Sequence, residues 1–219
     1  MKKTLFLVIV LALVSAVAIA QDAQSRGVIA INGGKMTVSM KGPQNVTVQK
    51  GQPAAGKFYD NVGTGGYNCC SGWTISDGSP IGTEYTLANQ IVSLKSGTTK
   101  KVLVGVGYVE GTNGATVDLV KDCKNMPCTD PDGKGKGKLC QGKIKNLPVF
   151  GQSSSQMVGF KCAVTLKKGK SYWVFVQAPA NTWLAWNLSN SGTGGLVEGT
   201  DDVWGSYNSG QPVGALTIK

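Results

Sequence analysis

Strict alternation in residues 158–167 constrains the fold more than any other feature of the sequence. Apolar residues occupy the even-numbered positions from Val158 to Leu166, and glycine, lysine, alanine and threonine occupy the odd-numbered ones. Successive side chains of a β-strand point to opposite faces, so the segment predicts a strand with one buried face. No segment sustains the spacing of three and four residues that an amphipathic helix needs.

The composition agrees with many short strands. The 219 residues include 31 glycines, and only 16% are charged. Strands with intervening turns recur about every 10 to 15 residues, which is typical of a β-sandwich. The Asn113-Gly114 pair predicts a hairpin turn between two of them. The expected strands are 35–41, 46–48, 73–75, a strand from residue 84, 101–109, 115–121, 158–167, 171–177, 182–188, 203–207 and 213–218.

The N-terminus has the pattern of a secretory signal peptide. Two lysines precede an apolar run from Leu5 to Val14, and Ala18-Ile19-Ala20 supplies a cleavage site. An uncleaved anchor is the alternative. The predicted organisation is a signal peptide (1–20), a strand or hairpin segment with a connector (21–56) and a β-sandwich domain (57–219). After cleavage the chain is expected to be secreted and not membrane-spanning.

Six cysteines in an exported chain predict disulfides. Because Cys123, Cys128 and Cys140 lie in or beside one loop, at least one bridge is expected inside it. Cys162 is expected either to be buried or to reach a neighbour such as Cys69 or Cys70. A bridge between the adjacent Cys69 and Cys70 is another alternative, and six cysteines allow 15 connectivities. The spacings do not match zinc sites and the chain has no histidine, so no metal or cofactor is predicted.

Two features of residues 122–145 bear on ligands. Asp130-Pro131-Asp132-Gly133 resembles the start of a calcium loop, but Lys134 and Gln141 occupy the fifth and twelfth positions. A turn is therefore expected there.

The formal net charge is +10, or +8 without Lys2 and Lys3. The lysine cluster in residues 122–145 is expected to lie in a solvated loop. The alternative is that it holds an anionic polysaccharide, extracellular nucleic acid or a phosphate-rich envelope. The cluster comprises Lys134, Lys136, Lys138, Lys143 and Lys145.

The sequence argues against an enzyme. Without histidine, triads of the Ser-His-Asp and Cys-His kinds are excluded. The chain has three glutamates, and the best acidic pair for a glycosidase is Asp201-Asp202. Adjacent residues of a strand point to opposite faces, which makes that pair hard to use. No catalytic residue is predicted, and a glycan hydrolase is the remote alternative.

Tryptophans offer the strongest route to ligand binding. Aromatic faces can stack on sugar rings, and Trp73, Trp183 and Trp204 are the candidates for exposed rings. Trp173 and Trp186 have apolar neighbours and are expected in the core. For each of the three candidates, packing inside the protein is still the expected state, and stacking on a sugar is the alternative.

The order of several motifs resembles secreted bacterial choice-of-anchor domains of a type R-like kind. The resemblance covers about residues 57–217 and lacks the usual C-terminal sorting tag. It implies a jelly-roll-like antiparallel sandwich outside a bacterial cell, in a family without an established activity. The matching pieces are Tyr59-Asp60-Asn61 with Gly72-Trp73, the segment 107–114, Asn146-Leu147-Pro148 with Phe150-Gly151, the segment 166–173, Leu184-Ala185-Trp186-Asn187, and Trp204.

Together these features predict a secreted, non-enzymatic, disulfide-bonded β-sandwich. A structural or interaction role at the envelope or extracellular matrix is expected, with an extracellular polysaccharide or an envelope protein as partner. A polysaccharide-binding module is the alternative, and intracellular nucleic acid is excluded by export. The segment Tyr59–Gln90, dense in Cys, Trp and Gly, is expected to form the entry of the sandwich, pinned by a disulfide.

Overall fold

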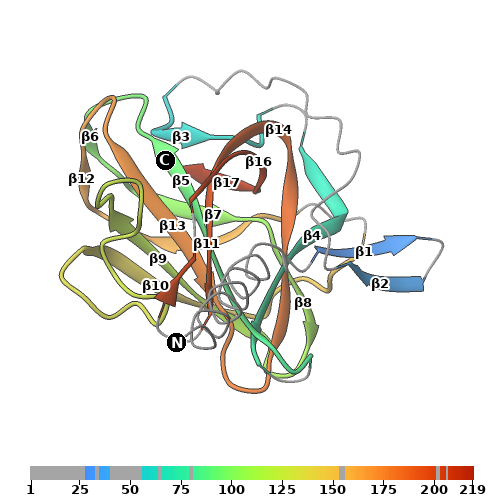
Figure 1. The fold of residues 1–219 in the computed structure, drawn as a ribbon. Helices are drawn as coiled ribbons and strands as arrows, with labels where there is room; N and C mark the ends of the chain where they lie inside the picture. The colour runs from blue at the N-terminus through green and yellow to red at the C-terminus, as the bar shows by residue number, and fades with distance from the viewer. Residues whose placement is uncertain are drawn as a thin grey trace, which may run out of the picture.

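The computed structural model describes residues 28–32, 35–39, 56–63, 66–78, 81–152, 156–200, 203–205 and 207–219. Strands and turns make up these ranges, and no residue in them lies in a helix, so none of them forms a helix able to cross a membrane. The prediction of an all-β fold is confirmed (Figure 1).

The strands follow one another closely along the described chain. They are β1 (Val28–Asn32), β2 (Lys35–Ser39), β3 (Tyr59–Asp60), β4 (Tyr67–Asp77), β5 (Glu84–Val92), β6 (Gly97–Thr98), β7 (Lys101–Val104), β8 (Val106–Glu110), β9 (Gly114–Lys121), β10 (Lys138–Lys145), β11 (Val158–Lys161), β12 (Thr165–Leu166), β13 (Ser171–Gln177), β14 (Trp183–Thr200), β15 (Val203–Trp204), β16 (Asn208–Gly214) and β17 (Leu216–Ile218).

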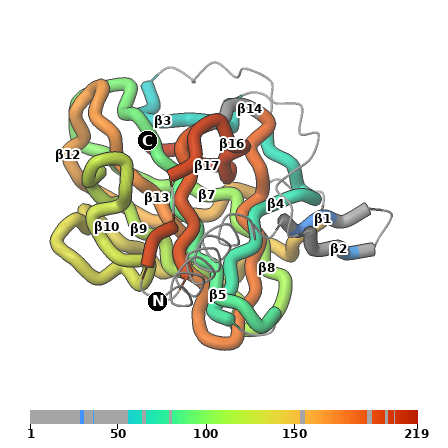
Figure 2. Tube along the Cα trace, viewed as in Figure 1, coloured from blue at the N-terminus to red at the C-terminus, as the bar shows by residue number. Residues whose placement is uncertain are grey.

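The long strand β14 connects the two parts of the main sheet. Its first half pairs with β4 and β8, and its second half pairs with β5, β15 and β16. Figure 2 shows β14 running the height of the molecule. Strands β9, β10 and β13 extend the sheet beyond β5. Part of this sheet closes into a five-stranded barrel, and β4, β5 and β14 each pair with the other two. The described strands do not divide clearly into the two sheets of a jelly roll.

Two smaller sheets complete the fold. Strands β11, β7, β17 and β3 form one, and β12 pairs with β6 in the other. Gly105 separates β7 from β8, and its N–H donates to the carbonyl of Ala215 at 2.9 Å. A Cβ at Gly105 would lie 2.8 Å from the Cβ of Ala215, so this close approach requires glycine.

Three apolar clusters form the interior. The largest includes Trp73 and Trp186 with residues from most strands. A second lies around Trp173 and Phe175, and Met126 and Trp204 pack against it. The third, built on Ile29, contains Phe150, Trp183 and Ala185. The core positions predicted for Trp173 and Trp186 are confirmed, since both are 0% exposed.

Some local predictions differ from the structure. The alternating segment 158–167 forms two strands, β11 and β12. Between them the Cys162 N–H donates to the Lys100 carbonyl, and the Cys162 carbonyl accepts from the Thr99 hydroxyl, which interrupts the strand. The hairpin expected at Asn113-Gly114 is wrong: β8 pairs with β14, whereas β9 pairs with β10 and β13. The Asn113 side chain instead holds Leu147 through two hydrogen bonds.

The N-terminal hairpin is β1 paired with β2 in the register Ile29↔Val38. Strand β1 also pairs with β4, with Val28 opposite Trp73, so the hairpin extends the main sheet. The predicted signal peptide and the strand at 46–48 lie outside the described residues.

Candidate functional site

The tryptophan candidates pack inside the protein. Trp73 is 1% exposed and its Nε1 donates to the carbonyl of Pro212 at 3.0 Å. Trp183 is 9% exposed. Trp204 is half-buried, edge-on to Phe175, with its Nε1 donating to the carbonyl of Thr129. The expected packing is confirmed for Trp73 and Trp183, because both complete apolar clusters. A ligand-binding role for the three rings stays a prediction.

All six cysteines form disulfides: Cys69–Cys70, Cys123–Cys128 and Cys140–Cys162. The bridge inside the 123–140 loop and the alternative of a vicinal bridge are confirmed. Cys162 is 2% exposed, which confirms the expectation that it is buried. Its bridge goes to Cys140 on β10 and not to Cys69 or Cys70, with a Cα–Cα distance of 6.0 Å. Among the described residues, no group of three His, Cys, Asp or Glu side chains could hold a metal ion.

The calcium-like segment is a turn, as expected. The backbone N–H of Lys134 donates to Asp130 Oδ1 at 2.6 Å, and the N–H of Gly133 donates to the Asp130 carbonyl at 2.9 Å. Lys134 pairs with Asp132, and Lys138 lies 3.4 Å from the buried Asp118. Two lysines of the predicted anion patch therefore have acidic partners, which weakens the patch. The Asp201-Asp202 pair lies outside the described residues.

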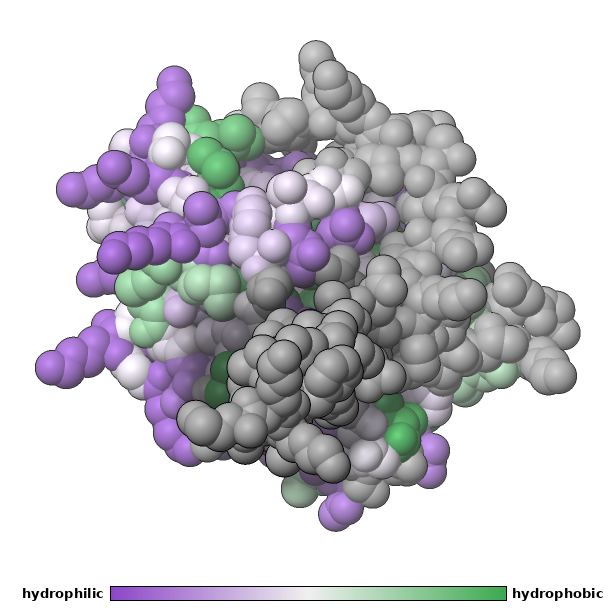
Figure 3. Space-filling view, viewed as in Figure 1, coloured by the Kyte–Doolittle hydropathy of each residue, from purple (hydrophilic) through white to green (hydrophobic). Residues whose placement is uncertain are grey.

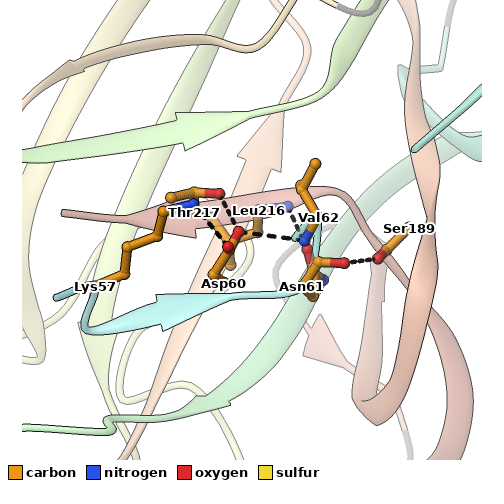
Figure 4. Close-up of polar contacts among 7 residues, drawn as sticks. All are labelled: Lys57, Asp60, Asn61, Val62, Ser189, Leu216 and Thr217. Carbon is orange, nitrogen blue, oxygen red and sulfur yellow. Dashed lines mark hydrogen bonds and ion pairs between the residues drawn. The ribbon is translucent and has the colours of Figure 1, made fainter. Parts of the chain in front are cut away.

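A buried polar clasp joins β3 to the C-terminal strand β17 (Figure 4). Strand β3 has only two residues, which are paired with Thr217 and Ile218. The Asp60 carboxylate accepts hydrogen bonds from the Thr217 hydroxyl at 2.7 Å and the Val62 N–H at 3.3 Å, and its other oxygen lies 2.7 Å from Lys57 Nζ. The side chain of Asp60 is fully buried, whereas that of Lys57 is 25% exposed. The clasp therefore fixes one lysine at the protein surface.

Asn61 forms the second half of the clasp. Its Nδ2 donates to the Gly214 carbonyl at 2.9 Å, and its Oδ1 accepts from the Leu216 N–H at 2.7 Å. The Ser189 hydroxyl donates to the backbone carbonyl of Asn61. Asn61 thus joins the end of β3 to β14 and to the segment that leads into β17.

Asp60 and Asp118 are predicted to give opposite pH dependence. Burial opposes ionisation of Asp60, but hydrogen bonds from Lys57 and Thr217 and the Lys57 charge outweigh it and hold its pKa below the ordinary 3.8. Burial raises the pKa of Asp118, and Lys138 and Gln141 offset only part of that effect. Ionised Asp60 therefore stabilises the fold above pH 3.8, and this stabilisation is lost as the pH falls through its lower folded-state pKa.

The measurement is urea unfolding from pH 7 to pH 2.5. Asp60→Asn is expected to destabilise most at neutral pH, with the difference from wild type shrinking below pH 3.8. Asp118→Asn is the control, with an effect of opposite sign. Because ionisation of Asp118 opposes folding, the free energy of unfolding of this variant, relative to that of wild type, should be higher at pH 7 than at pH 3. Parallel pH profiles for the two variants would contradict the assignment.

Lysines gather at one end of the molecule, called here the lysine-rich end. The backbone brings its segments together: the N–H of Leu94 donates to Phe58, that of Ser93 to Lys170, and that of Lys100 to Lys219. Figure 3 shows hydrophilic side chains along the left of the molecule, including the region of β6 and β12. Segments 56–60, 92–101, 159–171 and 216–219 contain a single acid, the buried Asp60. The lysines are Lys57, Lys95, Lys100, Lys101, Lys161, Lys167, Lys168, Lys170 and Lys219.

Two grooves flank β3 at this end. The first has a volume of about 320 Å³ and is lined by Tyr59, Asp60, Gln90, Val92, Leu94, Gly194 and Gly195. The second, of about 550 Å³, is lined by Gly56, Lys57, Phe58, Lys95, Ser96, Gly97, Thr98, Lys100 and Lys219. The first groove is partly apolar and the second is basic. Sequence patterns did not identify either one, because their walls come from segments far apart in the chain.

The arrangement can bind an anion but offers no described nucleophile with a base. Its charged side chains are ammonium groups, apart from the Asp60 carboxylate, which is enclosed in the clasp. Comparison of the chain with protein-family models, curated proteins and solved structures found no match.

Proposed function

We propose that the protein is a secreted, non-enzymatic binding protein of the cell envelope or extracellular matrix, and that it binds an acidic polysaccharide through the lysine-rich end. The observation that supports this most is the concentration of lysines around two grooves, in segments whose single acid is already paired. Clustered like charges raise the local concentration of a polymer of opposite charge.

The disulfides support the extracellular setting. Bridges of this kind persist in oxidising compartments, and the six cysteines form three of them. Kinship with choice-of-anchor domains, a jelly-roll-like topology and cleavage of the signal peptide belong to the same proposal. A polysaccharide is a better candidate than nucleic acid, because a base-stacking platform needs several exposed aromatic faces. Among the described residues, Tyr207 is the single exposed aromatic side chain.

The proposal predicts salt-sensitive binding of a polyuronate and no binding of neutral dextran. Lys168→Glu/Lys170→Glu is expected to weaken polyuronate binding roughly tenfold, about 1.4 kcal/mol, at low salt. The matched control is Lys143→Glu/Lys145→Glu, which changes net charge equally on exposed positions of β10. Biolayer interferometry with immobilised polymer, at increasing salt, provides the measurement. Equal weakening by both pairs would show general charge attraction, and no binding of any polyanion would refute the proposal.

A further inference from the structure

We propose that the two grooves beside β3 form one binding site for an acidic sugar unit. The sugar ring packs in the partly apolar groove, and its carboxylate, sulfate or phosphate group lies against Lys57 and Lys95 in the basic groove. This inference rests on the proposed function and assigns its ligand contacts.

The grooves are lined by consecutive parts of the same two segments. Residues 59–60 and 90–94 contribute to the first groove, and residues 56–58 and 95–100 contribute to the second. The N–H of Leu94 donates to the Phe58 carbonyl at 2.8 Å where the grooves meet. A ligand longer than one sugar can therefore contact both grooves along the same backbone segments.

The first groove has the chemistry of a sugar subsite. Val92 is 48% exposed and Leu94 is 42% exposed, and they lie beside the half-buried Tyr59. Figure 3 shows an apolar patch next to the hydrophilic side chains, near β3 and the end of β5 in the same view. Apolar walls with a few placed polar groups are typical of ligand pockets.

Gln90 is the placed polar group of this groove. Its Oε1 accepts from the Tyr207 hydroxyl at 3.1 Å, and its Nε2 donates to Asp122 at 3.2 Å. Its Nε2 also donates to Asn125 at 3.4 Å, so both amide hydrogens have partners and Oε1 keeps one acceptor site for a ligand hydroxyl. These contacts fix the amide, so it has little conformational entropy left to lose on binding. A Cβ at Gly195 would lie 2.8 Å from Gln90 Oε1, so glycine keeps this wall open.

The second groove holds two lysines in place before a ligand arrives. Asp60 positions Lys57 at 2.7 Å. Lys95 Nζ lies 4.5 Å from the centre of the Phe58 ring and donates to the Gly56 carbonyl. Asp60 offsets part of the charge of Lys57, so Lys95 contributes more of the attraction to an anion. Fixed side chains lose less conformational entropy on binding, so the two ammonium groups favour one anionic group at a defined point. Lys100 and Lys219 extend the positive lining.

The test uses a uronic-acid hexasaccharide and a neutral glucose hexasaccharide, with binding measured by calorimetry and by NMR shifts of backbone amides. We expect the acidic hexamer to shift amides in residues 56–60 and 90–98, and the neutral hexamer to shift none. Leu94→Ser removes apolar wall, and Lys95→Gln removes charge; each should weaken the acidic hexamer roughly tenfold. Inorganic polyphosphate should be weakened by Lys95→Gln alone, because it has no sugar ring.

The controls are matched in chemistry. Val203→Ser also removes an exposed apolar side chain, at a position 67% exposed on β15, and Lys143→Gln removes an exposed charge on β10. Both should bind like wild type. Wild-type affinity of Leu94→Ser for the hexamer would overturn the sugar subsite, and shifts confined to β10 would place the site elsewhere.

The outcomes also separate this inference from the proposed function. If polyuronate binds in a salt-sensitive way but the hexamer shifts no groove amide, the composite site is wrong and the polymer-binding function stands. If no polyanion binds, both are wrong. Equal affinity for a single-stranded oligonucleotide and the acidic hexamer would overturn the sugar assignment in favour of general polyanion binding.

Discussion

Replacing Asn61 with alanine is expected to lower the free energy of unfolding by about 2 to 3 kcal/mol, because a buried N–H loses its acceptor. Asn61 is 6% exposed, and its Oδ1 accepts from Leu216 at 2.7 Å. The Gly214 carbonyl loses the Asn61 amide but keeps the Asn89 amide at 3.2 Å. The penalty therefore arises mainly from the unpaired Leu216 N–H and from the loosened end of β17.

Urea unfolding at pH 7 measures this loss. Val62→Ala is the matched control, because Val62 contributes its backbone N–H to the clasp and keeps it in the variant. The control should lose no more than about 1 kcal/mol, since the side chain is only half-buried. Hydrogen exchange should also become faster in β17 of Asn61→Ala and stay unchanged in β9. A loss below that of Val62→Ala would mean that the clasp contributes little to the fold.

Alternation in the sequence predicted the strand content well but not how the strands associate. Residues 190–195 are rich in Gly, Ser and Asn, a composition typical of a loop, yet they continue β14. Pairing with β16 holds them extended, with Thr193 opposite Pro212. The small residues are needed there, because a Cβ at Gly195 would lie 2.5 Å from the Tyr207 ring. Local propensity favoured a turn, and tertiary packing overrode it.

The candidate site was harder to predict for a similar reason. Tyr59-Asp60-Asn61 belongs to the family-like pattern, but its partners Leu216 and Thr217 follow more than 150 residues later. The lysine cluster that the sequence indicates consists of neighbours in the chain, at 134–145. The lysine-rich end instead assembles from four separate segments, and only the fold brings them together.

Removing the Cys140–Cys162 disulfide is expected to lower the free energy of unfolding by about 3 kcal/mol in the chain-entropy model. The bridge spans 22 residues and links β10 to the chain after β11, so it closes a substantial loop in the unfolded state. Cys162 is also 2% exposed in the main core, and Thr99 donates to its carbonyl. Cys140→Ala/Cys162→Ala is the suitable variant, because alanine adds no polar atom to that core.

The matched control is Cys123→Ala/Cys128→Ala, whose bridge spans five residues in an exposed part of the loop. A shorter loop gives a smaller entropic effect, about 2 kcal/mol. Guanidinium unfolding without reductant compares the two variants directly. The longer bridge also ties down the segment that leads into Lys167, Lys168 and Lys170, so its loss should weaken polyuronate binding while the control variant binds normally. Equal stability and equal binding for both variants would mean that this bridge organises neither the core nor the lysine-rich end.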